Sequence, residues 1–290
     1  MKNYYAKYTP FLFLLPAGVI LGVFFFIPFF DSFLLSFQNF DNSLYHPVWV
    51  GFENYRQLLL SPVFWQVLWN TFVFMVVAVP VLVVLPIIIA VLLSQTLRGI
   101  TIYRVISYIP VIISIVVAGI AFKWLYSYEG LLNYFISFFG IPKVEWLTSP
   151  DVAIYSVIVL TVWKGLGYYA MIYLAALTTA PKELYEACDI DGASVLRKHL
   201  AITIPHLMPT IALVAVISSI SAMKVFVEIY VMTQGGPMNS TKTIVYYIYQ
   251  KAFENLDIGV ASACGIILLI ITMGLSVFNV KFFENQHQIG

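Results

Sequence analysis

Charged residues are scarce in this sequence. Only 10% of its 290 residues are charged, and 15 basic and 14 acidic side chains leave a formal net charge of +1. Soluble domains carry about 25% charged residues, and a strong basic field for nucleic acid is missing as well. Cysteine occurs only twice, at Cys188 and Cys264, so no disulfide framework is expected. Apolar residues make up 61% of the chain, and the mean hydropathy is +0.91. These proportions exclude soluble, disordered and disulfide-stapled classes and favour a helical membrane protein.

The sequence also lacks the motifs of common enzymes. It contains no His-Glu-x-x-His, no Gly-x-Ser-x-Gly and no Gly-x-x-x-x-Gly-Lys phosphate loop. Its four histidines are scattered, so we expect no metal site. We therefore predict a chain without catalytic residues and without a cofactor of its own, whose energy comes from another subunit.

Six apolar stretches are long enough to cross a bilayer, which takes about 20 residues in a helix. The runs are continuously apolar rather than alternating, which argues against a membrane β-barrel. The expected spans cover approximately residues 11–30, 71–93, 105–122, 152–177, 208–232 and 260–280. With no Gly/Ser linker to divide it, the chain is predicted to be all-α, with six transmembrane helices in a single domain over residues 1–290.

Six spans place both termini on one side of the membrane. That side holds 8 of the Lys and Arg residues, and the opposite side holds 5. Because cytoplasmic loops carry the excess of positive charge, we expect both termini in the cytoplasm.

The segment between the fourth and fifth spans, residues 180–205, is longer than a simple connection requires. Pro181 and the early acidic Glu183 and Glu186 favour a short helix. Asp191 is placed to cap a second one that starts at Gly192. We therefore predict two short helices at a sharp angle.

This segment resembles the EAA loop of the permease subunits of ABC importers. The similarity rests on Glu186-Ala187-Cys188-x-x-Asp191-Gly192-Ala193, followed by Ile204-Pro205, and is nearest the carbohydrate (maltose-type) branch. Cys188 departs mildly from the usual Ala. Further matches are Phe13-Leu-Leu-Pro16, Gly51-Phe-x-Asn54-Tyr55, Asn70-Thr71, Trp163-x-Gly165 and Thr233-x-Gly-Gly-Pro237. Together the matches cover roughly residues 9–283.

The resemblance implies a type I ABC importer permease that imports a sugar or oligosaccharide. Its implied partners are a second permease, two ATPase subunits that bind ATP and Mg²⁺, and an extracellular solute-binding protein. It also implies a bacterial or archaeal cytoplasmic membrane with its lipid. The loop is then a coupling helix that docks on an ATPase, with Glu186, Ala187, Asp191 and Gly192 as the coupling residues.

Ionisable residues inside the spans are candidates for function. Lys164 lies midway along the fourth span and is expected to face a cavity or a neighbouring helix. Lys224 and Glu228 are four residues apart, so on a continuous helix they share a face and can pair. That pair is either structural or part of the substrate path.

The resemblance implies that sugar contacts come from the fourth and fifth spans. On the fourth span these are Thr161, Lys164, Gly165 and Tyr168. On the fifth span they are Ser218, Ser221, Ala222 and Val225, with Lys224 and Glu228 beside them. Each set follows a 0, 3, 4, 7 spacing, which is one stripe of a helix. The alternative is that these small residues only let helices pack closely.

The sequence is compatible with two chemical classes of cargo. Tyr168 offers a ring face and a hydroxyl, which suits a sugar. Two lysines within the spans also allow an anionic cargo such as glycerol phosphate or an acidic sugar. A membrane enzyme or a channel that works without an ATPase is the rival from another class.

Overall fold

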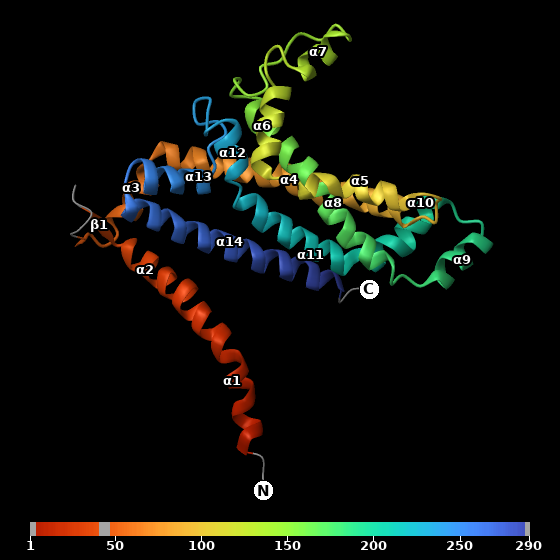
Figure 1. The fold of residues 1–290 in the computed structure, drawn as a ribbon, viewed down its shortest axis with the longest axis horizontal. Coiled ribbons are helices and arrows are strands. Elements are labelled where there is room, and N and C mark those ends of the chain that lie inside the picture. The colour runs from red at the N-terminus through yellow and green to blue at the C-terminus, as the bar shows by residue number, and fades with distance from the viewer. Residues whose placement is uncertain (1–3, 41–46, 288–290) are drawn as a thin grey trace. The chain divides into compact units, whose positions relative to one another are not determined.

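The computed structural model describes residues 4–40 and 47–287 (Figure 1). In chain order the elements are α1 (Tyr4–Leu21), the π-helical turn η1 (Gly22–Phe26), α2 (Ile27–Leu35), β1 (Gln38–Phe40), β2 (Pro47–Trp49), α3 (Glu53–Leu60), α4 (Pro62–Ser94), α5 (Ile100–Ile112), α6 (Ile115–Leu125), α7 (Leu131–Ser137), α8 (Ala153–Leu177), α9 (Lys182–Ile190), α10 (Val195–Lys198), η2 (His199–Thr203), α11 (Ile204–Met223), α12 (Val227–Met232), α13 (Ile244–Tyr249), η3 (Gln250–Glu254) and α14 (Ile258–His287).

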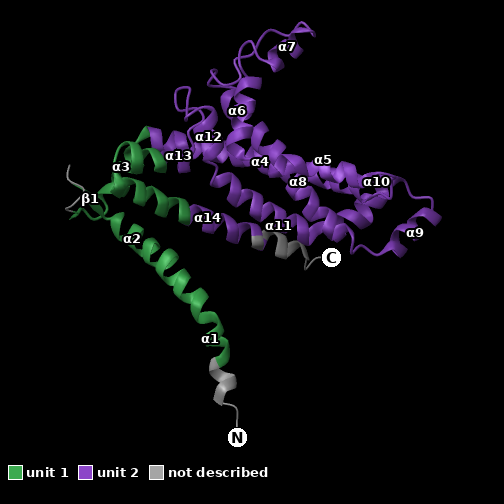
Figure 2. Ribbon diagram, viewed as in Figure 1, with its two compact units in different colours: residues 1–62, 248–269 green, residues 63–247, 270–290 purple. Residues whose placement is uncertain are grey.

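The chain divides into two compact units (Figure 2). The first comprises Met1–Pro62 and Ile248–Leu269, and the second comprises Val63–Tyr247 and Ile270–Gly290. The part of the chain that the structure describes contains five helices long and apolar enough to cross a membrane, and up to six if the bent pair Ile100–Ile112 and Ile115–Leu125 counts as one span. The prediction of a helical membrane protein is therefore confirmed, with five or six spans and one short β-hairpin.

In the first unit, the uncharged N-terminal run forms a helical span from Thr9 to Leu35, which is longer than the predicted 11–30. A short antiparallel hairpin follows, in which Gln38 of β1 lies opposite Trp49 of β2. The amide of Asn54, at the start of α3, donates to the carbonyl oxygens of Ser36 (2.9 Å) and Gln38 (2.8 Å). These bonds attach α3 to the hairpin.

The second unit is built around α8, which packs against α5, α6, α11 and α12. Leu160 and Tyr173 of α8 are fully buried, as is Val214 of α11. Because the mostly apolar sequence of α8 offers apolar side chains in every direction, the helix buries several faces at once.

Two glycines of α8 permit its close approach to other helices. A Cβ atom on Gly167 would collide with the carbonyl oxygen of Ser107 on α5. A Cβ atom on Gly165 would lie 2.8 Å from Leu82 of α4. Gly165, which the sequence placed in the substrate path, therefore has a packing role.

The third predicted span, 105–122, is not one straight helix. α5 ends at Ile112 and α6 begins at Ile115, and their axes differ by 93°. Ile113 and Ser114 between them are extended, so the last carbonyl groups of α5 have no partner within the helix.

The fifth predicted span, 208–232, is also interrupted. α11 ends at Met223, Lys224 caps it, and α12 starts only at Val227. Thr243 stabilises the break because its hydroxyl donates to the carbonyl of Val225 (3.0 Å). The sequence does not show this interruption, because Lys224 and Glu228 are two isolated charges in a segment that is otherwise mostly apolar.

We expect Gly167→Ala to destabilise the protein, because the added methyl group collides with a backbone atom that cannot move without displacing α5. Overpacking of this kind costs about 1–3 kcal/mol. Thermal unfolding of the purified protein, followed by size-exclusion fluorescence, will show a lower midpoint. Gly274→Ala is the control, because a Cβ there meets nothing within 4 Å. Equal midpoints for the two variants would show that α5 and α8 are not in close contact.

Candidate functional site

The 180–205 loop contains two short helices, α9 and α10, joined by a tight turn. Gly192 has φ +71°. The amide of Gly192 donates to the carbonyl of Asp189 (3.2 Å), and that of Ala193 donates to the carbonyl of Cys188 (3.0 Å). This pair of bonds is the Schellman motif, in which a residue of left-handed conformation ends a helix. Glycine is favoured at position 192 because it adopts that conformation without strain.

The prediction that Asp191 caps the second helix is wrong. Asp191 is the C-cap of α9. The N-cap of α10 is Ser194, whose hydroxyl oxygen accepts a hydrogen bond from the amide of Arg197 (3.4 Å). The turn takes two residues beyond Asp191, because the Schellman motif occupies Gly192 and Ala193.

Side-chain contacts hold the two arms of the loop together. Lys198 forms an ion pair with Asp189 of α9 (2.5 Å). The hydroxyl of Tyr185 lies 2.9 Å from that of Thr203 in η2, and His199 Nδ1 lies 3.0 Å from the same hydroxyl. The loop is thus a braced unit rather than a flexible link.

The four predicted coupling residues, Glu186, Ala187, Asp191 and Gly192, are all exposed. So are large apolar side chains of the same loop, including Ile190 (87% exposed) and Leu196 (70% exposed). Exposed apolar groups on a rigid polar loop are typical of a surface that binds another protein.

Lys164 does not project into an open path. Its ammonium group donates to the carbonyl oxygens of Pro110 (3.2 Å), Val111 (3.1 Å) and Ile113 (2.5 Å). These are the carbonyls left free where α5 ends. An ammonium group has three protons to donate, so Lys164 uses all three to bind the free carbonyl groups at the end of α5. Of the two predicted roles, the structure supports the one between helices.

Lys224 and Glu228 do not form an ion pair in the described part of the chain, because the break in the fifth span separates their faces. Lys224 is exposed. Glu228, in the first turn of α12, instead interacts with Thr161 and with the charge of Lys164, both on α8. Both interrupted spans therefore meet α8 through one polar cluster, which consists of Thr161, Lys164 and Glu228.

The other predicted path residues differ in exposure. Buried side chains belong to Ser218, Ala222 and Val225. The Ser218 hydroxyl donates back to the carbonyl of Val214 (2.7 Å), as is usual within a helix. Tyr168 (42% exposed) and Ser221 remain accessible. Because Val225 lies beyond the end of α11, the set predicted on the fifth span is not one continuous helical face.

At the other end of α8, hydrogen bonds attach the Thr233–Thr243 segment to α4. Asn70 donates to the carbonyl oxygens of Asn239 (2.7 Å) and Lys242 (3.0 Å). Gln66 donates to the carbonyl of Met238 (3.1 Å), and the amide of Ile244 donates to the Thr71 hydroxyl (2.9 Å). The Asn-Thr pair at the start of the second span therefore positions the Thr-x-Gly-Gly-Pro turn.

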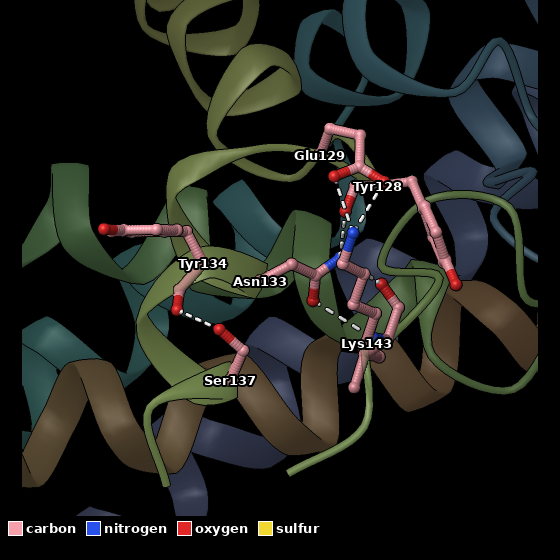
Figure 3. A network of polar contacts seen from close by, with 7 residues as sticks. Tyr128, Glu129, Asn133, Tyr134, Ser137 and Lys143 are labelled. Carbon is pink, nitrogen blue, oxygen red and sulfur yellow. Dashed lines mark hydrogen bonds and ion pairs between the residues drawn. The ribbon is translucent and has the colours of Figure 1, made fainter. Parts of the chain in front are cut away.

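The segment between α6 and α8 is organised by Asn133, a residue that sequence reasoning missed (Figure 3). Asn133 is fully buried, and its amide nitrogen donates to the carbonyl oxygens of Tyr128 (3.0 Å) and Val144 (2.9 Å). Nearby, Lys143 pairs with Glu129 (2.6 Å). No local sequence pattern marks this asparagine, because its partners lie up to 13 residues away.

Within the described residues, no group of three or more His, Cys, Asp or Glu side chains could hold a metal ion. The polar residues that do gather hold backbone groups or one another. These polar contacts therefore position helices and loops.

Comparison with known proteins identifies the family. Residues 59–283 match the family of binding-protein-dependent transport system inner membrane components, and the chain belongs to this family. It is 34% identical over 275 residues to the arabinooligosaccharides transport system permease protein AraP of Halalkalibacterium halodurans, covering 93% of this chain and 86% of that one. It is 32% identical to the sulfoquinovosyl glycerol transport system permease protein SmoG of Agrobacterium fabrum, covering 95% and 90%.

The fold has a counterpart among solved structures. A chain of a bacterial ABC transporter involved in the import of the acidic polysaccharide alginate aligns with a TM-score of 0.86 at 24% identity, covering 98% of both chains. The protein thus has the fold of an ABC importer permease, and the resemblance seen in the 180–205 loop is confirmed.

We expect Lys164→Met to destabilise the protein strongly. The substitution leaves three partly buried carbonyl groups without a donor, and a polar group that loses its partner away from water costs about 1–3 kcal/mol. Lys224→Met is the matched control, because Lys224 is exposed. A melting midpoint that falls for Lys164→Met and stays within about two degrees for Lys224→Met is the predicted result. If both variants melt at the same temperature as the native protein, Lys164 does not stabilise the break between α5 and α6.

Proposed function

We propose that this chain is a permease subunit of an ATP-driven importer of a sugar or oligosaccharide. The observation that carries the proposal is the braced and exposed 180–205 loop at one end of α8, in a chain of this transporter family. The AraP relative is named for arabinooligosaccharides, and its similarity over nearly the whole chain supports a related cargo.

The proposed transporter contains several further subunits. A second permease completes the translocation path, two ATPase subunits bind ATP and Mg²⁺, and a solute-binding protein delivers the cargo from outside. Both termini and the 180–205 loop face the cytoplasm. This chain contributes helices and docking surfaces and no catalytic group.

In the proposed mechanism the 180–205 loop acts as a lever. An ATPase subunit binds Glu186 and the exposed apolar residues of α9 and α10. The Schellman turn and the Lys198–Asp189 ion pair keep α9 and α10 at a fixed angle. Because the loop does not deform, movement of the ATPase is transmitted to α8 and α11. Nucleotide then shifts the permease pair between inward-open and outward-open states.

An anionic cargo is the second candidate, and the similarity to SmoG favours it. The geometry of Lys164 argues against a direct role of that residue in anion binding, because its ammonium group is taken by three backbone carbonyls. Lys224 is exposed and is the side chain that an anionic cargo would use.

The coupling proposal predicts that Glu186→Lys combined with Gly192→Val abolishes co-purification of the ATPase with the permease pair. The charge reversal repels a basic partner, and valine disfavours the left-handed turn at position 192. Glu254→Lys, an exposed charge reversal in η3, is the control and should co-purify normally. Intact assembly and ATP-driven accumulation in the double variant would refute the coupling role of the loop.

The cargo proposal predicts that the partner solute-binding protein is stabilised by neutral oligosaccharides. Its melting temperature should rise by several degrees with arabinotriose or maltotriose, because a ligand that binds only the native state stabilises it. Glycerol 3-phosphate at the same concentration should leave the melting temperature unchanged. The reverse pattern would establish the anionic cargo instead.

A further inference from the structure

A cavity of about 500 Å³ lies within the second unit, at the end of α8 opposite the 180–205 loop. Three segments line it, namely residues 123–128 at the end of α6, 145–148 before α8, and 232–237, which include the Thr-x-Gly-Gly-Pro turn. Figure 1 shows α6 and α12 gathered at this end, and α9 and α10 at the other. α8 has 25 residues and is about 37 Å long, which is enough to cross the membrane. If the 180–205 loop faces the cytoplasm, this cavity opens to the outside.

The walls of the cavity are held in place by hydrogen bonds. Asn133 accepts from the amide of Val144 (3.0 Å) and from the indole nitrogen of Trp146 (2.9 Å). On the opposite wall, the Thr241 hydroxyl donates to the carbonyl of Gly236 (2.7 Å) and lies 2.8 Å from the Thr233 hydroxyl. A cavity with fixed walls is preorganised for a ligand, because little conformational entropy is lost on binding.

Aromatic and polar groups alternate along the lining. The rings of Tyr126 and Trp146 stack with centroids 5.8 Å apart, and Tyr128 is 55% exposed. Burial raises the pKa of Tyr126 to about 12, so its phenol stays neutral. The polar lining side chains are Lys123, Ser127, Glu145, Thr148 and Thr233.

This lining matches the chemistry of a sugar ring. Aromatic faces suit the C–H faces of a pyranose or furanose, and hydroxyl and carboxylate groups bind its hydroxyls in both directions. The charges of Lys123 and Glu145 cancel, and Lys143 beside the cavity is neutralised by Glu129. A cavity without net charge favours a neutral sugar over an anion. The volume lies within the range of about 300–1,000 Å³ that is usual for small-ligand sites.

We propose that this cavity is an entry subsite that binds one ring of a neutral oligosaccharide while the rest of the chain extends toward the membrane path. The proposal rests on the proposed sugar import and adds to it a preference for length. On this proposal a disaccharide occupies only one of the two sites, whereas a tetrasaccharide occupies both, and its binding gains from the two sites being linked.

The test uses the full transporter with its binding protein in proteoliposomes. ATP-driven uptake is measured with radiolabelled maltose and maltotetraose, and with arabinobiose and arabinotetraose. Tyr128→Ala removes an exposed ring of the lining, and Glu145→Gln removes its carboxylate without changing its shape. For each variant, the KM for the tetrasaccharide should rise at least fivefold, and that for the disaccharide should stay within twofold.

Tyr134→Ala is the matched control, because Tyr134 is equally exposed (59%) on the same segment but does not line the cavity. It should leave uptake of both lengths unchanged. If the native transporter accumulates these sugars but Tyr128→Ala and Glu145→Gln leave KM unaltered, or impair both lengths equally, the subsite is refuted and the proposed function stands. If the native transporter accumulates no sugar of either length, both proposals fail.

Discussion

Backbone carbonyl groups inside a bilayer must find hydrogen-bond donors within the protein, and this requirement governs the centre of the molecule. The bend between α5 and α6 frees three carbonyls, and Lys164 supplies the three protons that they need. The ammonium group reaches them only because Gly167 lets α8 approach the backbone of α5. One glycine and one lysine, a single turn apart, thus make a bent span possible where a straight one was expected.

Much of the fold could be predicted from the sequence, because a continuous apolar run of about 20 residues has few alternatives to a membrane helix. The interruptions in the third and fifth spans could not, since a mostly apolar segment has the same hydropathy whether its helix is continuous or broken. Lys164 was recognisable as exceptional from its position alone. Its partners were not, because they lie more than 50 residues away in the sequence.

The 180–205 loop was likewise predicted in part from the sequence. Its existence and its two short helices follow from Pro181 and the acidic residues after it, and its exposure agrees with a docking role. The cap of the second helix was misassigned, because Asp191 and Ser194 are both good N-cap residues and only the backbone conformation of Gly192 decides between them. Asn133 gave no signal at all, since a buried asparagine is recognised by distant partners rather than by its neighbours in sequence.

The N-terminal span has a consequence for how the protein exists in a cell. Within the part of the chain that the structure describes, the most apolar window of Thr9–Leu35 buries none of its residues, and Phe13 and Phe24 are nearly four-fifths exposed. Few of these side chains pack against the rest of the chain, so most of this helix surface is left for lipid or another protein to cover. The orientation of this helix therefore depends on the lipid or protein that surrounds it.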